Sequence, residues 1–239
     1  MGPIPQKLCL PFLVLVAIAW SSAFALGGEA TEGNKNDTSQ KIEELIEKLA
    51  SPNPKPTIID SGDGIWKIKY PPGFSHDAQK KVLAARDQLA AKEAAAFPYL
   101  IERYDDRHYS MSICTSINEA WYNYSVGWVC SDIIRKHIEP LGPFTEGKEG
   151  NDDPDPRFRP PRPFYFDKFL QAKVAARAWW KTHSDKSLRE MQIEAIEWTI
   201  AEEKKRNEPK DAADLEYLPK VLKKLKKSDK PLPPDQDYP

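Results

Sequence analysis

Apolar residues recur at helical spacing in seven stretches of this chain, and clusters of prolines separate several of these stretches. Between Ile42 and Leu49, for example, they follow the i, i+3, i+4, i+7 pattern that places side chains on one face of a helix. The 22 prolines among 239 residues are about twice the usual share, and a proline rarely continues a helix. The sequence therefore predicts a mainly α fold of about seven helices. We expect these helices within residues 42–49, 75–89, 94–104, 126–138, 166–180, 188–200 and 211–227.

Serine residues mark where three of the predicted helices begin. Ser75 and Ser125 each precede an apolar helical pattern, and a serine in that position accepts a hydrogen bond from the first turn. Ser187 and Glu190 have the spacing of a capping box. In the helix expected at 166–180, we predict a single apolar stripe formed by Phe166, Leu170, Val174 and Ala178.

Two short segments alternate apolar and polar residues as strands do. Residues 65–70 follow a Ser-Gly-Asp-Gly turn, which predicts a small hairpin with Ile58 and Ile59. Residues 109–113 also alternate and lead into Cys114, which predicts a small extended insertion between two helices.

The N-terminus has the three parts of a secretory signal peptide. Lys7 precedes an apolar run from Leu8 to Trp20, and residues 23–25 form an A-x-A cleavage site. We therefore expect residues 1–25 to be removed and the protein to be exported to the periplasm or the extracellular space. The alternative is an uncleaved membrane anchor, although Pro11 interrupts a run that is short for a membrane span. Apart from such an anchor, we expect no membrane contact.

Cys114 and Cys130 are the cysteines of the expected mature chain. In an oxidising compartment an even number of cysteines favours a disulfide, and closing this loop would add about 3 kcal/mol of stability. A zinc site with His108 and His137 is the alternative, but the four residues lack the short paired spacing of structural zinc sites. We expect one disulfide and no metal.

The segment Ala94–Asp106 resembles the first helix of a HEAT repeat, in which a proline inside an apolar helix is followed by an acidic turn. The helix at 126–138 would be the second helix of that repeat. Residues 216–225 resemble the first helix of a HEAT repeat more weakly. About eighteen residues separate the pair, where a HEAT repeat has a tight turn. The chain is also similar to a group of uncharacterised exported bacterial proteins. The matching features are Phe97–Asp106, Tyr109-Ser110, Ser125-Val126-Gly127 with Cys130, and Ser187-Leu188 with Met191-Gln192.

This resemblance implies a HEAT-like stack of about seven helices, with the small extended insertion and one disulfide. It also implies scaffolding or protein interaction, and it supplies no catalytic residues. The expected organisation is a signal peptide (1–25), a flexible leader (26–38), a HEAT-like helical region with the insertion (39–141), a Pro-rich loop or linker (142–163), C-terminal helices (164–227) and a disordered tail (228–239).

The densest aromatic cluster is the candidate binding surface. It consists of Trp121, Tyr122, Tyr124 and Trp128, and in an exported protein such rings could stack on a sugar or hold a partner. The alternative is that the four rings pack around the expected Cys114–Cys130 bridge as a small satellite core.

A catalytic role is not expected. Asp105, Asp106 and His108 lie close to Ser110 and Ser112, but no serine has the glycine pattern of a nucleophile elbow. Carboxylates at such positions more often cap a helix or form ion pairs. We therefore expect no catalytic residue and no cofactor.

The charge balance bears on the class of partner. With 35 basic and 36 acidic residues the net charge is −1, which does not favour nucleic acid as a ligand. We expect an exported, non-catalytic binding or scaffolding protein whose HEAT-like helical surface holds another protein. The alternative is an envelope-associated carbohydrate-binding or hydrolase accessory protein, which would bind glycan at the Trp121 to Trp128 cluster.

Overall fold

The computed structural model describes residues 32–60, 66–114, 121–139, 164–206 and 212–234. The expected signal peptide and the linker at 142–163 lie outside these residues. The described part is mainly helical, as predicted. The α-helices are α1 (Glu32–Glu47), α2 (His76–Ala90), α3 (Phe97–Glu102), α4 (Val126–Ile138), α5 (Tyr165–Phe169), α6 (Lys173–His183), α7 (Leu188–Arg206) and α8 (Ala212–Lys227).

Two antiparallel hairpins complete the described elements, together with a 3-10 turn at Glu93–Ala96. The first hairpin joins β1 (Thr57–Asp60) to β2 (Trp66–Lys69), and it confirms the predicted strand pair. The second joins β3 (Tyr109–Cys114) to β4 (Trp121–Ser125) and forms the small extended insertion. The sequence predicted β3 but not β4.

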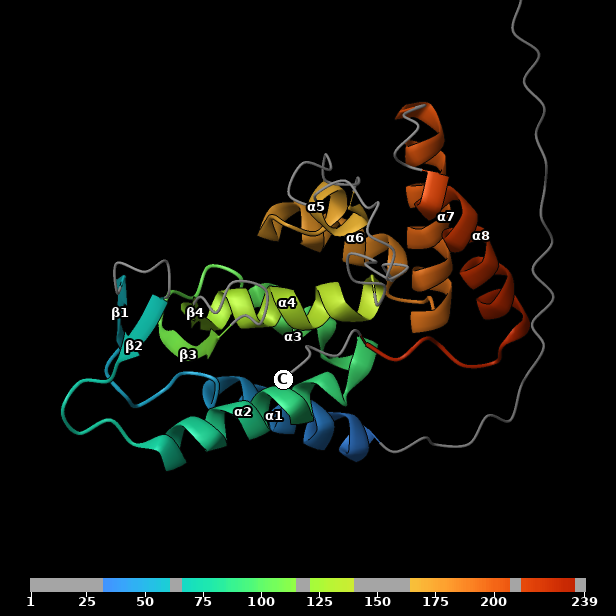
Figure 1. Ribbon diagram of the computed structural model, residues 1–239. Coiled ribbons are helices and arrows are strands. Elements are labelled where there is room, and N and C mark those ends of the chain that lie inside the picture. Colours follow the sequence, from blue (N-terminus) through green and yellow to red (C-terminus); the bar gives the residue numbers. More distant parts are fainter. Residues whose placement is uncertain (1–31, 61–65, 115–120, 140–163, 207–211, 235–239) are drawn as a thin grey trace, which may run out of the picture.

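The helices are arranged in successive layers (Figure 1). Helices α1 and α2 lie side by side beneath α3 and α4, and α5 and α6 lie above them. Helices α7 and α8 pack against each other at the end of α4 that is remote from the hairpins. Most buried apolar residues from α1 to α7 form one core, and a smaller core joins α7 to α8.

The three predicted serine caps are confirmed. The Oγ atom of Ser75 accepts a hydrogen bond from the Ala78 N–H at 3.1 Å. Ser125 caps α4 in the same way. At the start of α7, the Ser187 N–H donates to a Glu190 carboxylate oxygen at 2.7 Å, which completes the capping box. Local sequence therefore determines where these helices begin.

The predicted apolar stripe from Phe166 to Ala178 is wrong. The chain leaves the helical conformation between α5 and α6, so the 3.6-residue period does not continue across this segment. Phe166 and Leu170 are buried, but Val174 is 79% exposed.

Helix α4 packs with its backbone against the turn that follows α3. The Gly127 N–H donates to the Asp106 carbonyl at 2.9 Å, and the Val126 N–H donates to the His108 carbonyl at 2.9 Å. A Cβ atom on Gly127 would lie 2.2 Å from the carbonyl oxygen of Tyr104. Only glycine permits this close approach of two backbones.

The other end of α4 is held by one buried amide. Gln192 of α7 donates to the His137 carbonyl at 2.7 Å and to the Leu232 carbonyl at 3.0 Å. Its own oxygen accepts a hydrogen bond from the Leu232 N–H at 2.8 Å. Part of the segment expected as a disordered tail is thus bound to α7.

The expected Cys114–Cys130 disulfide is not found, because Cys130 is a free, fully buried cysteine. Cys130 lies on the inner face of α4 near Tyr104 and Asp106, whereas β3 ends with Cys114 paired to Trp121. Sequence separation gave no information about these different surroundings. The side chain of Cys114 lies outside the described side chains.

No described helix combines the length and apolar character needed to span a membrane.

We predict that Gly127→Ala lowers the free energy of unfolding by about 2–3 kcal/mol or more, because the added methyl group would force two backbones apart. Urea denaturation measures this change. Gly73→Ala is the control, since a Cβ there meets open space and only the positive φ of 79° is unfavourable, at a cost of about 1 kcal/mol. Equal losses in the two variants would contradict the proposed backbone contact.

We also predict that Cys130 resists alkylation in the folded protein. Burial raises the pKa of its thiol to about 12, so the reactive thiolate is scarce at pH 8. Iodoacetamide should leave Cys130 unmodified in the folded protein. Once the protein is unfolded, it should modify Cys130 even when no reductant is present, and peptide mass spectrometry measures both outcomes. If modification of the unfolded chain required reductant, Cys130 would be in a disulfide after all.

Candidate functional site

Three of the four candidate aromatic residues form a continuous stack, which we call the aromatic ladder. The ring centroids of Tyr122 and Tyr124 are 6.4 Å apart, with 25° between the ring planes. Those of Tyr124 and Trp128 are 3.7 Å apart, with 20° between the planes. The ladder therefore runs from β4 onto the first turn of α4.

Local geometry explains the alignment of the ladder. Alternation along β4 places Tyr122 and Tyr124 on the same face of the strand. The strand passes directly into α4, and the Ser125 hydroxyl accepts a hydrogen bond from the Trp128 N–H at 3.2 Å. This cap fixes the first helical turn, which carries the indole of Trp128 to the ring of Tyr124. Trp121 lies on the opposite face of β4 and is not part of the ladder.

The two ends of the ladder are open to solvent. Tyr122 is 43% exposed and Trp128 is 40% exposed, while Tyr124 is partly buried against the main core. The cluster is therefore anchored in the core at its middle and exposed at both ends. Such a partly exposed aromatic surface is a candidate binding site.

Two hollows adjoin the ladder, and Trp128 lines both of them. The first hollow, of about 210 Å³, is lined by Lys55 and Arg107 together with Tyr124. The second, of about 530 Å³, lies between the start of α4 and the α5–α6 region and includes Asp132 and Lys173. Trp128 therefore separates a basic hollow from one that contains both acidic and basic groups.

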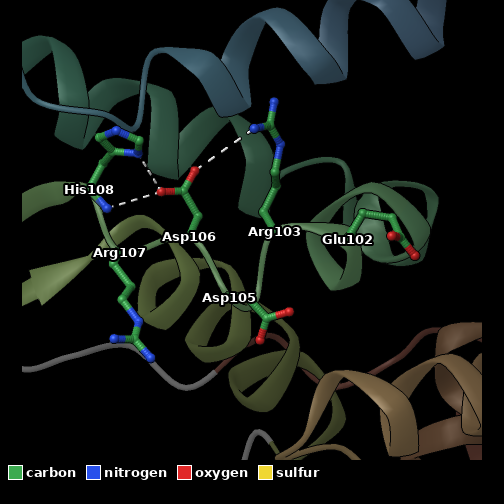
Figure 2. A pocket seen from close by; sticks show the side chains of 6 residues that line it. All are labelled: Glu102, Arg103, Asp105, Asp106, Arg107 and His108. Atoms are coloured by element: carbon green, nitrogen blue, oxygen red, sulfur yellow. Dashed lines mark hydrogen bonds and ion pairs between the residues drawn. The ribbon is translucent and has the colours of Figure 1, made fainter.

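The turn at 102–108 borders both hollows and forms a third, shallow depression (Figure 2). Asp106 lies between Arg103 and His108, and its carboxylate is 2.8 Å from the His108 Nδ1 atom and 3.8 Å from an Arg103 nitrogen. The side chain of Arg107 points away from this group. Burial raises the pKa of Asp106, but hydrogen bonds from His108 outweigh burial, so the pKa is lowered.

Among the described residues, neither Ser110 nor Ser112 makes a hydrogen bond with His108. The hydroxyl of Ser110 is buried and has no hydrogen-bond partner there. That of Ser112 donates to the Asn123 side chain at 2.5 Å. His108 itself is 82% exposed at its side chain. Asp106 also accepts a hydrogen bond from the His108 N–H at 3.0 Å, so its carboxylate shapes the turn that supports α4.

The geometry offers no support for the zinc alternative within the described residues, where no three His, Cys, Asp or Glu side chains are grouped to bind a metal. The Nδ1 atom of His137 lies 2.7 Å from the Ile133 carbonyl. It is therefore engaged by its own helix.

A polar network around Glu194 was missed by sequence reasoning. Its carboxylate accepts hydrogen bonds from Tyr165 at 2.7 Å and Lys186 at 2.5 Å, and lies 2.9 Å from the His183 ring. Trp179 donates to the Tyr165 hydroxyl at 2.8 Å. The network joins α5, α6 and α7. The capping box at Ser187 and Glu190 was the one nearby feature that the sequence showed, and it predicts only the start of α7.

The donors around Glu194 favour the ionised form of its carboxyl group. Burial raises its pKa, but hydrogen bonds from Lys186, His183 and Tyr165 outweigh burial and hold the pKa at about 2. Because these hydrogen bonds connect neighbouring helices, we regard the network as an element that stabilises the fold.

In comparisons with known proteins, no family model, curated protein or solved structure matches this chain.

We predict that Glu194→Gln lowers the free energy of unfolding at pH 7 by about 1–2 kcal/mol, a value reduced for solvent screening because the side chain is 38% exposed. The folded-state pKa lies below the ordinary value of 4.5. The stabilisation is therefore complete above pH 4.5 and decreases as the pH falls toward 2.

Urea denaturation of both proteins between pH 7 and pH 2.5 tests this dependence. The difference between wild type and Glu194→Gln should shrink below pH 4.5. Glu197→Gln is the control, because Glu197 makes an exposed ion pair with Lys226 that contributes less than about 1 kcal/mol. A difference that stays constant across this pH range would contradict the assignment.

Proposed function

We propose that this chain is an exported, non-catalytic carbohydrate-binding protein and that the sugar binds at the aromatic ladder. The observation that carries the proposal is the stack of Tyr122, Tyr124 and Trp128, which is anchored in the core and exposed at both ends. The flat face of a ring packs well against the apolar face of a pyranose, and the polar edges of the sugar stay hydrated.

The distribution of exposed apolar side chains favours the ladder over the helical surface as the binding site. Among the described residues, the large exposed apolar side chains are Ile59, Tyr70, Tyr122, Trp128 and Val174. All except Val174 lie in or next to the two hairpins. A protein partner on the helical faces, the first expectation, would meet few apolar anchors there, and interfaces usually depend on such anchors.

The ladder also requires little reorganisation on binding. Tyr124 packs between its two neighbours, and Trp128 is held by the Ser125 cap of α4. A surface that is already ordered loses little conformational entropy when it binds a ligand. Modest contacts with a sugar can then give measurable affinity.

We predict that Trp128→Ala weakens glycan binding by about 10- to 100-fold, because it removes the exposed end of the ladder. A glycan array would first identify oligosaccharides that bind the wild-type protein, and isothermal titration calorimetry would then compare the variants. Trp121→Ala is the matched control, since this tryptophan lies in the same hairpin but outside the ladder. Its affinity for the oligosaccharide should stay within about twofold of wild type.

Two results would contradict the proposal. One is a wild-type protein that binds no glycan on the array. The other is a folded Trp128→Ala variant that binds its glycan as tightly as wild type. Thermal unfolding of each variant shows whether it is folded.

A further inference from the structure

The ladder has unpaired positive charge on one side only. Lys55 and Arg107 line the first hollow with Tyr124 and Trp128. Neither basic side chain makes an ion pair or a hydrogen bond with any residue in the described part of the chain. Two cations without counter-ions beside an aromatic surface indicate that the ligand itself supplies the negative charge.

Two basic side chains near this hollow, Arg103 and Lys173, differ from Lys55 and Arg107 because each has an acidic partner. Arg103 pairs with Glu47 of α1 and lies 3.8 Å from Asp106. Lys173 lies 3.4 Å from Asp105. These pairs join segments of the fold, so their charges are already compensated.

The second hollow shows the same compensation. There Asp132 pairs with Arg135 at 2.6 Å and with Lys136 at 3.0 Å. The lining of that hollow also includes Asp105 and Asp167. An anionic ligand would meet carboxylates on this side of Trp128 and free cations on the other side.

We propose that the glycan bound at the ladder is acidic, a uronic-acid type of polysaccharide whose carboxylates lie between Lys55 and Arg107. This proposal rests on the carbohydrate-binding function proposed above and specifies its ligand class. A guanidinium group binds a planar carboxylate through two parallel hydrogen bonds, and an ammonium group adds a mobile point charge. The sugar ring then stacks on Trp128, with its charged edge on the side of the first hollow, whose lining includes Lys55 and Arg107 and no carboxylate.

The test compares oligosaccharides that differ only in charge. Isothermal titration calorimetry would measure binding of a galacturonate hexamer and of the matching neutral galactose hexamer to the full protein. Hexaglutamate and a six-nucleotide oligothymidylate are added as anions without a pyranose. We expect the acidic hexamer to bind at least about tenfold more tightly than the other three at low salt, and its preference over the neutral hexamer to weaken at 0.5 M salt.

Charge variants locate the effect. Lys55→Ala and Arg107→Ala should each weaken binding of the acidic hexamer about 3- to 10-fold and leave binding of the neutral hexamer unchanged. Arg107→Lys should give an intermediate loss, because it keeps the charge but not the paired hydrogen bonds. Lys181→Ala, which removes an exposed lysine on α6, is the control and should have no effect. Thermal unfolding verifies that each variant is folded.

The outcomes separate this proposal from the one on which it rests. Equal binding of the acidic and neutral hexamers, with both lost in Trp128→Ala, would overturn the acidic ligand and retain the glycan-binding function. Binding of hexaglutamate or oligothymidylate as tightly as the acidic hexamer would overturn the acidic glycan as the ligand class. If neither these hexamers nor any glycan on the array bound the wild-type protein, both proposals would fail.

Discussion

The structure depends on the close backbone contact between the start of α4 and the turn at 103–108. Gly127 allows this contact, because any side chain there would overlap the carbonyl of Tyr104. Two backbone hydrogen bonds from Val126 and Gly127 hold the helix in place. Helix α4 in turn contacts α2, α3, α7 and the second hairpin, so its position sets the arrangement of the layers. The position of the first turn of α4 therefore determines where the indole of Trp128 lies.

The same contact connects the stability of the fold to the candidate site. Asp106 shapes the turn through its hydrogen bond to the His108 N–H, and the next residue, Arg107, reaches the first hollow. On the other side of the turn, Arg103 and Asp105 pair with Glu47 and Lys173, which belong to different helices. The acidic residues of this turn thus make contacts that hold it against neighbouring elements. The first hollow beside this turn is lined by aromatic and basic side chains together with polar ones.

Local features were predictable from the sequence and long-range features were not. Ser75, Ser125 and Ser187 form their caps with residues three positions away, so the sequence contains the whole interaction. Strand β4 was missed because its strand character depends on pairing with β3 across the hairpin. The prediction of a disulfide at Cys130 was wrong because the spacing of cysteines in the sequence does not show which face of α4 contacts which neighbour. The sequence showed the aromatic cluster from Trp121 to Trp128, but the stacking of Tyr122, Tyr124 and Trp128 and the position of the cations became visible only in the fold. HEAT-like packing stays a prediction.

The most direct test of the central claim is an NMR titration that follows the indole N–H signals of the tryptophans as a galacturonate hexamer is added. Our account predicts that the Trp128 signal shifts with saturation. The Trp179 signal should stay unchanged, because this indole is buried and donates to the Tyr165 hydroxyl. Saturating shifts at Trp179 or at backbone amides of α6 and α7, without a shift at Trp128, would contradict the account and place the binding site on the helical surface.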